Sequence, residues 1–463
     1  MTAREENLAR LESEEFDVLI VGGGINGAGI ARDLAMRSKD AGMGMKIGLI
    51  DKGHFSSGTS GRNSQLIHGG LRYLENLEFG LVKEALRERA TLLKIAPHLV
   101  EPLPMLIPFY GRFDRYYYGA GLALYDMLAG SQNIGKRRHL TREEARRLEP
   151  DLATEGLHSA AIFFDCKVHS ARLLLENVFD AARMGAAIAN YVEAGEWNGR
   201  EVPATETLTE RRFSIRAKKL VDARGPWEGR GNVRLVRGSH IVVPRLTRSE
   251  NAIAYFGPDG RIMFVIPWGE NNDLSLVGTT DVDHAGSPDD VHISTEEIEY
   301  LQGNLRRLFP GRPVEHVAAF ASLRPLVASG SKSATAASRS HKIWLEDGRL
   351  LKIAGGKYTT YRAMASEAVD LLAPELRGRC RTSEVRLGNS LDGVAPEQRV
   401  KHAVRHEMAM RLPDVMYAST YWGHERKLTR ENLLPVAREM GEELGWDERR
   451  MEEEIARITG SSR

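Results

Sequence analysis

The sequence predicts an α/β protein in three parts: a nucleotide-binding domain with parallel strands, a second domain built on an antiparallel sheet, and a helical domain at the C-terminal end. Three observations lead to this prediction. A glycine-rich motif follows a short apolar run at 17–21, β-rich runs separated by turn residues occupy 237–294, and charged amphipathic segments fill 380–463. The motif is the most specific, because an apolar strand, a glycine turn and a helix start follow one another as in a Rossmann-like domain.

The glycines of this motif, Gly22, Gly24 and Gly27, stand at G-x-G-x-x-G spacing. The first permits a sharp turn, the second lets a pyrophosphate approach the backbone, and the third lets the helix pack against the strand. Unpaired amides at the helix start, with the positive end of the helix dipole, favour a bound anion. We therefore expect a dinucleotide here, with Asn26 also among the residues that contact it.

A second predicted strand at 46–50 ends in Asp51, whose carboxylate suits a ribose hydroxyl, and Lys52 follows it. The turn at 38–45 makes the distance from the motif to this acid longer than usual. The loop at 56–64 then combines small and hydroxyl side chains with a guanidinium, a surface that can line the pyrophosphate and the ribityl chain of a flavin. The candidate flavin contacts in this loop are Ser57, Thr59, Ser60, Arg62 and Ser64.

The sequence LIHGGLRYLE at 66–75 places His68, Arg72 and Tyr73 close together. This segment resembles the FAD-dependent glycerol-3-phosphate dehydrogenases of the aerobic, quinone-linked type, which oxidise glycerol 3-phosphate to dihydroxyacetone phosphate. The resemblance extends from residue 16 to about 458, with specific matches at 323–326 (LRPL) and 355–362 (GGKYTTYR). It implies FAD as the cofactor and a D-amino acid oxidase-like architecture with an additional C-terminal helical unit.

On this basis the expected FAD-binding domain is discontinuous and comprises 14–95, 150–232 and 350–375. The expected substrate domain takes 96–149 and 233–349, and the helical domain takes 380–463. A helix is predicted to begin near Lys357, and its positive end would stabilise the negative charge that collects on a reduced flavin. Further flavin contacts are expected from Val192, Gly225, Gly356, Lys357 and Thr359.

Four features depart from the family pattern. Arg224 stands where a small hydroxyl residue is usual, and Gln65 stands where a basic residue is common. The turn at 38–45 is longer, and the loop at 329–338 is not acidic. The first departure concerns a local flavin contact, whereas Gln65 and the loop bear on the identity of the substrate.

Oxidation of a secondary alcohol requires removal of the hydroxyl proton while hydride passes to the flavin, and a histidine suits the proton step. His68 and His240 are the candidates, and His68 is preferred because it shares a short segment with an arginine and a tyrosine. Arg324 is expected to hold phosphate or to polarise the reacting oxygen. Guanidinium groups bind phosphate through paired hydrogen bonds. The expected phosphate clamp is Arg72, Tyr73, Arg339 and Lys357.

The expected reaction is the oxidation of sn-glycerol 3-phosphate, with electrons passed to a quinone. Two alternatives within the enzyme class stay open: a dehydrogenase of a related polyol phosphate, such as erythritol phosphate, and an oxidase that returns electrons to oxygen. A non-catalytic flavoprotein is the alternative outside that class, and the two histidines with the cationic set argue against it.

Composition sets the remaining expectations. The 463 residues suffice for two or three domains, and 64 basic against 63 acidic residues give no bulk charge for binding nucleic acid. Cys166 and Cys380 are expected to be reduced thiols, and no metal site is expected from them or from the histidines of the C-terminal part. The N-terminal segment lacks a signal-peptide core, and no apolar run reaches the ~18 residues of a membrane span. We expect a cytoplasmic protein, or one held on the inner face of the cell membrane, with a homodimer as a candidate assembly.

Residues 101–130 are unusually aromatic, with Phe113, Tyr116 and Tyr117 interleaved with Arg112 and Arg115. Either these aromatics fill the core behind a domain wall, or they form a surface that touches lipid headgroups and gives access to a quinone. We favour the wall. The resemblance supports the surface, since family members that reduce quinone sit on the membrane.

Overall fold

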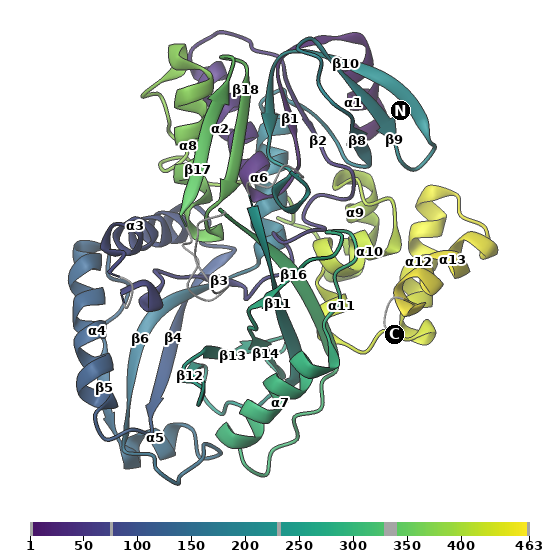
Figure 1. The fold of residues 1–463 in the computed structure, drawn as a ribbon. Helices are drawn as coiled ribbons and strands as arrows, with labels where there is room; N and C mark the ends of the chain where they lie inside the picture. The colour runs from purple at the N-terminus through teal and green to yellow at the C-terminus, as the bar shows by residue number, and fades with distance from the viewer. Residues whose placement is uncertain (1–2, 75–76, 229–232, 328–339, 461–463) are drawn as a thin grey trace.

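The computed structural model describes residues 3–74, 77–228, 233–327 and 340–460, with only the backbone of Arg72. Two sheets and their helices form the upper and lower parts of the molecule in Figure 1, and the last helices lie to one side. Cys166 and Cys380 are both free thiols, as expected.

The first sheet has the strand order β17-β18-β10-β1-β2-β7, and β8 and β9 extend it beside β10. Strand β1 pairs in parallel with β10 and β2, and β2 pairs in parallel with β7. The strands are β1 (Glu15–Val21), β2 (Ile47–Ile50), β7 (Ala187–Ala189), β8 (Val192–Ala194), β9 (Glu201–Glu206), β10 (Arg211–Asp222), β17 (His341–Glu346) and β18 (Leu350–Gly355). The helices that cover them are α1 (Ala3–Ser13), α2 (Ile25–Asp40), α6 (Ser170–Arg183) and α8 (Tyr361–Leu372).

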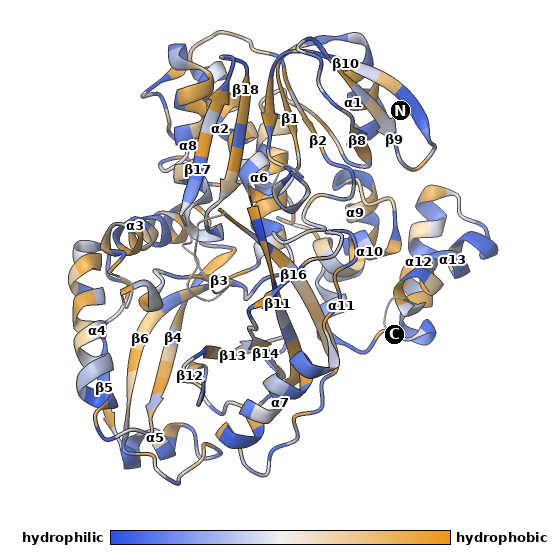
Figure 2. Cartoon of the chain, in the orientation of Figure 1, coloured by the Kyte–Doolittle hydropathy of each residue, from blue (hydrophilic) through white to orange (hydrophobic). Residues whose placement is uncertain are grey.

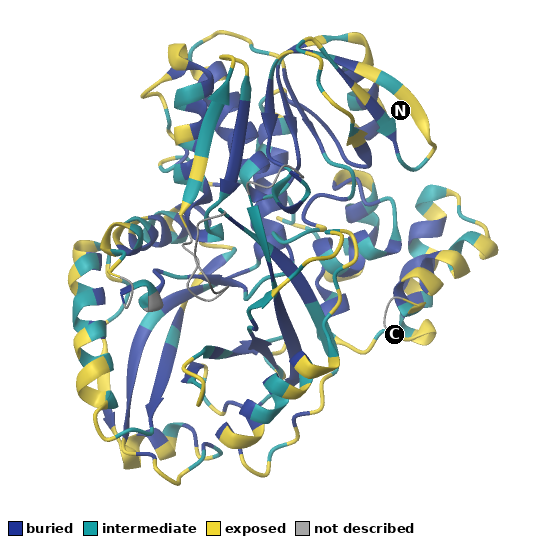
Figure 3. Cartoon of the chain, in the orientation of Figure 1, coloured by how far each residue is buried: buried dark blue, intermediate teal, exposed yellow. Residues whose placement is uncertain are grey.

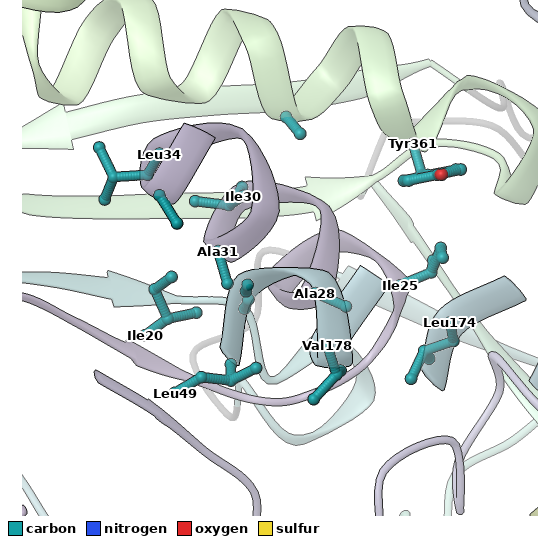
Figure 4. Packing of buried hydrophobic residues seen from close by; sticks show 14 of the residues in the cluster. Ile20, Ile25, Ala28, Ile30, Ala31, Leu34, Leu49, Leu174, Val178 and Tyr361 are labelled. Atoms are coloured by element: carbon teal, nitrogen blue, oxygen red, sulfur yellow. The ribbon is translucent and has the colours of Figure 1, made fainter. Parts of the chain in front are cut away.

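Successive side chains of a strand point to opposite faces of the sheet, and those of β1 are buried on both faces. Val18 and Ile20 pack with α2, α6 and α8, whereas Leu19 and Val21 pack with α1 and β9. Figure 4 shows α2 wedged between the strand residues and the flanking helices, with Leu174 and Tyr361 beside it. This packing fixes the start of α2 at the carboxyl end of β1, where the glycine motif lies.

The second sheet has the order β15-β11-β14-β13-β12-β4-β6-β3, with β16 beside β11 and β5 beside β6. It is antiparallel except that β12 and β4 pair in parallel. Its strands are β3 (Leu66–Ile67), β4 (Val100–Phe109), β5 (Arg138–Thr141), β6 (Ser159–Val168), β11 (Val233–Pro244), β12 (Ala252–Phe256), β13 (Ile262–Trp268), β14 (Leu274–Gly278), β15 (Val282–Asp283) and β16 (Ala318–Val327). Its helices are α3 (Phe79–Ile95), α4 (Asp114–Ala129), α5 (Arg142–Leu148) and α7 (Thr295–Leu308).

Three strands lie in the sheet other than the one that the expected domain ranges would give. Strand β3 falls within 14–95 but pairs with β6 of the second sheet. Strand β6 falls within 150–232 but pairs along its whole length with β4 of the second sheet. Strand β17 falls within 233–349 but forms a hairpin with β18 in the first sheet. In all three cases pairing with a partner strand outweighs position along the chain.

Helices make up most of the C-terminal part. They are α9 (Arg399–His406), α10 (Leu412–Asp414), α11 (Trp422–Glu425), α12 (Arg430–Leu444) and α13 (Glu448–Gly460), with a π-helical turn, η7 (Val415–Ser419). Short 3₁₀ turns elsewhere are η1 (Leu71–Leu74), η2 (Gly130–Gln132), η3 (Gly225–Trp227), η4 (Tyr358–Thr360), η5 (Pro374–Leu376) and η6 (Pro396–Gln398). The outer faces of α12 and α13 are largely hydrophilic and exposed, whereas their inner faces share one apolar cluster (Figures 2 and 3).

This C-terminal unit is joined to the first sheet and its helices by buried polar contacts. Arg172 of α6 donates to Glu407 over 2.6 Å, and Tyr191 donates to Asp414, also over 2.6 Å. Paired charges in a protein interior cost several kcal/mol when one partner is lost. The unit is therefore attached by specific contacts as well as by apolar area.

Candidate active site

A cavity of about 940 Å³ lies where the carboxyl ends of β1, β2 and β10 meet β11 and β16 of the second sheet. Its size is at the upper end of the roughly 300–1,000 Å³ typical of small-molecule sites. Most of the residues predicted from the sequence line it. These are Gly22, Gly24, Asn26, Asp51, Lys52, Ser57, Thr59, Ser60, Arg62, Ser64, His68, Tyr73, Val192, Gly225, His240, Arg324, Gly356 and Lys357.

The glycine turn behaves as its spacing predicts. Gly22 has φ of 106°, and a Cβ on it would lie 2.5 Å from the carbonyl oxygen of Ala223. A Cβ on Gly27 would lie 1.9 Å from the carbonyl oxygen of Gly22, so this glycine serves the packing of α2 and does not line the cavity. Gly24 leaves the backbone open toward the cavity, and the amide of Ile25 donates to Ser60 Oγ at 3.0 Å.

The acid after β2 is held by two backbone amides. Asp51 Oδ2 accepts from Gly23 N at 2.7 Å, and Oδ1 accepts from Gly53 N at 2.8 Å. Burial raises the pKa of this carboxyl, although both amide bonds favour its charged form. The two bonds fix the carboxylate where the glycine turn and the second strand meet, which is the expected place for a ribose contact.

The loop 57–64 is fastened to the second sheet. The hydroxyl of Thr59 donates to the carbonyl of Leu323 at 2.5 Å, and Ser64 Oγ lies 2.9 Å from His240 Nε2. Ser322 donates to the carbonyl of Arg62 at 2.5 Å. Hydroxyl side chains therefore hold the nucleotide end and the opposite end of the cavity in one register, through bonds to β16 and β11.

Cations and histidines gather at the end of the cavity formed by the second sheet. Arg324 donates to Thr279 Oγ1 at 2.7 Å and to Asp281 Oδ1 at 2.8 Å, which fixes its guanidinium. Lys357 Nζ lies 3.6 Å from the centre of the Tyr73 ring. This end can bind an anion, and it offers imidazole groups for proton transfer.

A family model described as FAD dependent oxidoreductase matches residues 17–362, which is most of the chain. The chain belongs to the FAD-dependent oxidoreductase family. It is 38% identical over 381 residues to glycerol-3-phosphate dehydrogenase 2 of Mycobacterium tuberculosis, an alignment that covers 78% of this chain and 63% of that protein. It is 35% identical over 399 residues to the aerobic glycerol-3-phosphate dehydrogenase of Staphylococcus epidermidis, with 81% of this chain and 70% of that protein covered.

The same fold occurs in the glycerol-3-phosphate dehydrogenase from Bacillus halodurans complexed with FAD. The TM-score is 0.78 at 24% identity, and the match covers 99% of this chain and 97% of that one. The predicted fold class is thus confirmed: a Rossmann-like FAD-binding part, a second sheet and a helical C-terminal part. The residues around the cavity fit FAD, because a glycine cradle, a helix N-terminus and the carboxylate of Asp51 lie in sequence along one wall.

Arg224, one of the departures from the family pattern, is turned onto its neighbour in this oxidoreductase. Its Nε and Nη2 donate to the two oxygens of Asp222 at 2.9 and 2.6 Å. Hydrogen bonding to Asp222 raises the pKa of the Arg224 guanidinium. The arginine still lines the cavity, but its charge is balanced by the paired carboxylate.

Thr359, an expected flavin contact, does not line the cavity. The helix predicted from Lys357 begins at Tyr361, because 358–360 form the 3₁₀ turn η4. Thr359 is therefore turned away from the cavity, and its Oγ1 accepts from the amide of His68 at 3.2 Å. The side chain of Arg72 lies outside what the structure describes, as do Arg339 and the loop 329–338.

Sequence reasoning missed a contact across the mouth of the cavity. Asp289, in the segment between β15 and α7, accepts from Lys52 Nζ at 2.6 Å and from Trp227 Nε1 at 2.8 Å. Lys52 Nζ also lies 4.8 Å from the centre of the Trp227 ring. All three residues line the cavity, and they join the first sheet to the second. Of the three, only Lys52 was a candidate cofactor contact from the sequence, and nothing there connected it to Asp289 or Trp227.

We expect Lys52→Met to speed the release of FAD about two- to fivefold, because the contact across the mouth of the cavity loses the exposed ion pair between Lys52 and Asp289. The measurement is the rise of flavin fluorescence after dilution, at low salt and at about 0.5 M salt, where screening should remove the difference. Lys218→Met is the matched control, since Lys218 forms an exposed pair with Asp17 at 2.7 Å away from the cavity. An equal change in both variants would contradict a role for Lys52 in retaining FAD.

Three buried histidines make the protein sensitive to acid. Burial lowers the pKa of His169, His240 and His424 to about 3 each. Their folded-state pKa lies below the ordinary value near 6.5, so the unfolded chain binds more protons as the pH falls from about 6.5 toward 3. The free energy of unfolding should then drop by up to about 4 kcal/mol per pH unit from these three groups, and above that window they contribute no pH dependence.

Urea unfolding followed between about pH 4 and 7 checks this expectation. His169→Phe should reduce the slope by about 1.4 kcal/mol per pH unit, because one buried titrating group is removed. The control is His98→Gln, which replaces an exposed histidine. If the His169 variant keeps the parent slope, the histidine does not stay neutral in the folded protein.

Proposed function

We propose that this oxidoreductase converts sn-glycerol 3-phosphate into dihydroxyacetone phosphate. One observation carries the proposal: Arg324, Lys357, His68 and His240 line the same cavity as the nucleotide-binding glycine turn. Relatives named as glycerol-3-phosphate dehydrogenases at 35–38% identity support the same reaction. The chain spans 63% of the length of the mycobacterial relatives, so the proposal concerns the part that it shares with them.

FAD, when bound, supplies the acceptor for the hydride that leaves C2 of the substrate. We assign the hydroxyl proton to His68. An imidazole accepts a proton efficiently near neutral pH when its own pKa lies close to that pH. Burial lowers the pKa of His240 to about 3, and its Nε2 is engaged with Ser64 Oγ. His240 is therefore better suited to orient the substrate by hydrogen bonding than to take up its proton.

The phosphate is assigned to the cationic end of the cavity. Arg324 is fixed by Thr279 and Asp281, and Lys357 lies beside the Tyr73 ring, so both cations are held in place before the substrate arrives. Arg72 and Arg339 complete the proposed clamp. In this proposed arrangement the first sheet serves the cofactor and the second sheet serves the substrate.

Anaerobic absorbance of the oxidised flavin band, before and after addition of glycerol 3-phosphate, tests the proposed reaction, with glycerol as the control. Bleaching by the phosphate ester alone is the expected result. Bleaching only by another phosphorylated polyol, such as erythritol phosphate, would make that compound the substrate in place of glycerol 3-phosphate. No bleaching by any of them would overturn the enzymatic function.

The electrons are proposed to leave for a quinone, and the exposed face of α4 is proposed to contact lipid. The aromatic stretch at 101–130 serves partly as a core wall and partly as an exposed surface. Tyr118 and Tyr125 pack into the core, whereas Phe113, Tyr116 and Met127 are 79%, 70% and 70% exposed. Along the described chain, no helix has both the length and the apolar character needed to cross a bilayer. Aromatic and basic side chains on one helix are typical of a helix that lies on a membrane surface.

Combined Phe113→Ser and Tyr116→Ser should lower co-sedimentation with anionic lipid vesicles about tenfold, because two large exposed side chains no longer enter the interface. Met43→Ser, which removes an apolar side chain that is also exposed but lies outside α4, is the control. Equal sedimentation of the parent and the double variant would rule out this face. A readmitted quinone that reoxidises the bleached flavin faster than oxygen does would support the proposed acceptor.

A further inference from the structure

The C-terminal unit places one short segment directly behind the cavity. We call residues 415–425 the back wall; they comprise η7, α11 and the residues between them. Three of its aromatic side chains contact residues that lie more than 90 positions earlier in the chain. Tyr417 meets Arg62 of the loop 57–64, Tyr421 meets Gln65 directly after that loop, and His424 meets Phe320 of β16. The back wall is therefore not confined to packing within its own helical unit.

The first contact is made by the hydroxyl of Tyr421. It donates to Gln65 Oε1 at 3.0 Å, accepts from Ala171 N at 2.7 Å and lies 2.8 Å from Ser170 Oγ. Burial raises the pKa of Tyr421 to about 12, so the phenol keeps its proton and remains a donor. The ring is also stacked on His169, with centroids 3.9 Å apart and planes 6° from parallel.

Both ends of the bond between Tyr421 and Gln65 have an unusual backbone. Tyr421 has φ of 66° and Gln65 has φ of 55°, in the left-handed region that residues other than glycine rarely adopt. Such conformations persist only where surrounding contacts fix them, and they cluster at functional sites. Gln65 immediately precedes β3 and follows Ser64, so its backbone sets the direction of the loop that leads to His68.

The second contact balances a buried cation. The guanidinium of Arg62 lies 5.8 Å from the centre of the Tyr417 ring, and among the described residues no carboxylate pairs with it. Burial lowers the pKa of Arg62, which agrees with a charge that has lost water without gaining an acid. A ring face stabilises such a cation without neutralising it, so Arg62 keeps its charge for the cavity that it lines.

The third contact reaches His240 through one intermediate ring. His424 packs on Phe320 with centroids 4.4 Å apart, and Phe320 is stacked on His240 at 5.1 Å with planes 16° from parallel. His240 Nε2 lies 2.9 Å from Ser64 Oγ, so the plane of the imidazole determines whether this bond can form. His424 is 3% exposed, and its ring is tilted by 52° against that of Phe320.

We propose that the back wall positions the active site, with Tyr421 and His424 as positioning residues: Tyr421 fixes the loop at Ser64 through Gln65, and His424 fixes the ring plane of His240 through Phe320. The C-terminal unit then acts on flavin reduction without touching FAD or substrate. The kinetic part of this inference rests on the proposed function, whereas its effect on the flavin environment does not.

Tyr421→Phe tests the first arm, because it removes the hydroxyl and keeps the stacked ring. We expect the rate of flavin reduction to fall about tenfold with KM little changed, and the absorbance band of the oxidised flavin to shift. Tyr191→Phe is the matched control. Tyr191 is also buried, has φ of 57°, and donates its hydroxyl across to the C-terminal unit, but its partner is Asp414 and it does not line the cavity. It should lose stability like Tyr421→Phe and keep the parent rate and spectrum.

A second pair of variants keeps the inference testable if Tyr421→Phe does not fold. His424→Ala removes the packing on Phe320 and should lower the reduction rate about tenfold, whereas His424→Phe restores a ring and should stay within about twofold of the parent. Equal rates and equal spectra for Tyr421→Phe and Tyr191→Phe, or an unchanged rate for His424→Ala, would overturn the proposal. If no phosphorylated polyol bleaches the parent, the proposed function fails, and the spectral comparison alone still decides the positioning role.

Discussion

Arg324→Met is expected to lower the rate of flavin reduction by glycerol 3-phosphate by about 10²–10³-fold while FAD remains bound. The guanidinium is the one cation of β16 that lines the described cavity, and Thr279 and Asp281 hold it in place. The guanidinium is already oriented before the substrate binds. Its removal should therefore lower the rate directly, and not through the movement of another side chain. Stopped-flow absorbance under anaerobic conditions measures the rate directly.

The control for this variant is Arg234→Met. Arg234 lies on β11, which pairs with β16, and donates to Asp283 at 2.6 Å, so an arginine–aspartate pair is broken without a change in the cavity lining. Its rate should stay within about twofold of the parent, in keeping with the small contribution of exposed ion pairs. Arg324→Lys should fall between the two, because an ammonium keeps the charge but not the paired geometry. A parent-like rate for Arg324→Met would remove Arg324 from the proposed site.

Gly27→Ala is expected to abolish FAD binding and to destabilise the fold by roughly 3 kcal/mol or more. The added Cβ would lie 1.9 Å from the carbonyl oxygen of Gly22, a backbone atom that cannot rotate away. Relief requires α2 to move from β1, and this movement would displace the helix N-terminus that faces the cofactor. Thermal unfolding and the ratio of flavin to protein absorbance report the two effects separately.

Gly80→Ala is the control for the helical glycine. Gly80 lies in α3, and a Cβ built on it meets no atom within 4 Å. This variant should be neutral or more stable by up to about 1 kcal/mol, because alanine favours a helix over glycine. Retention of stoichiometric FAD by Gly27→Ala would contradict the close packing of the motif.

The sequence was sufficient for the parts of the site that depend on local order. Gly22, Gly24 and Asp51 could be placed because a strand, a tight turn and a helix leave few alternatives for the residues between them. The helix after Lys357 was placed less well. A 3₁₀ turn delays its start to Tyr361, and the extra turn directs Thr359 toward His68. Helix ends are set by capping and by tertiary contacts that periodicity does not report.

The parts that could not be predicted depend on long-range contacts. Asp289 meets Lys52 across 237 positions of the sequence, and Tyr421 meets Gln65 across 356. Neither pair has a motif, because a carboxylate or a phenol on a loop is usually a solvated or capping group. Gln65 stood out only as a departure from the family pattern, and the structure gives it a partner in the C-terminal unit.

The order of strands in the first sheet also governs how the protein can be made. Strand β1 pairs with β10, which is synthesised about two hundred residues later; Glu15 lies opposite Arg216. Strand β10 in turn pairs with β18, which is completed only when residues 350–355 have been made. While the ribosome is still producing the second sheet, β10 has an open edge, and the pocket wall contributed by Gly356 and Lys357 does not yet exist. We therefore expect flavin to be captured at the end of synthesis, and until then the unpaired edge of β10 stays open to pairing with other chains.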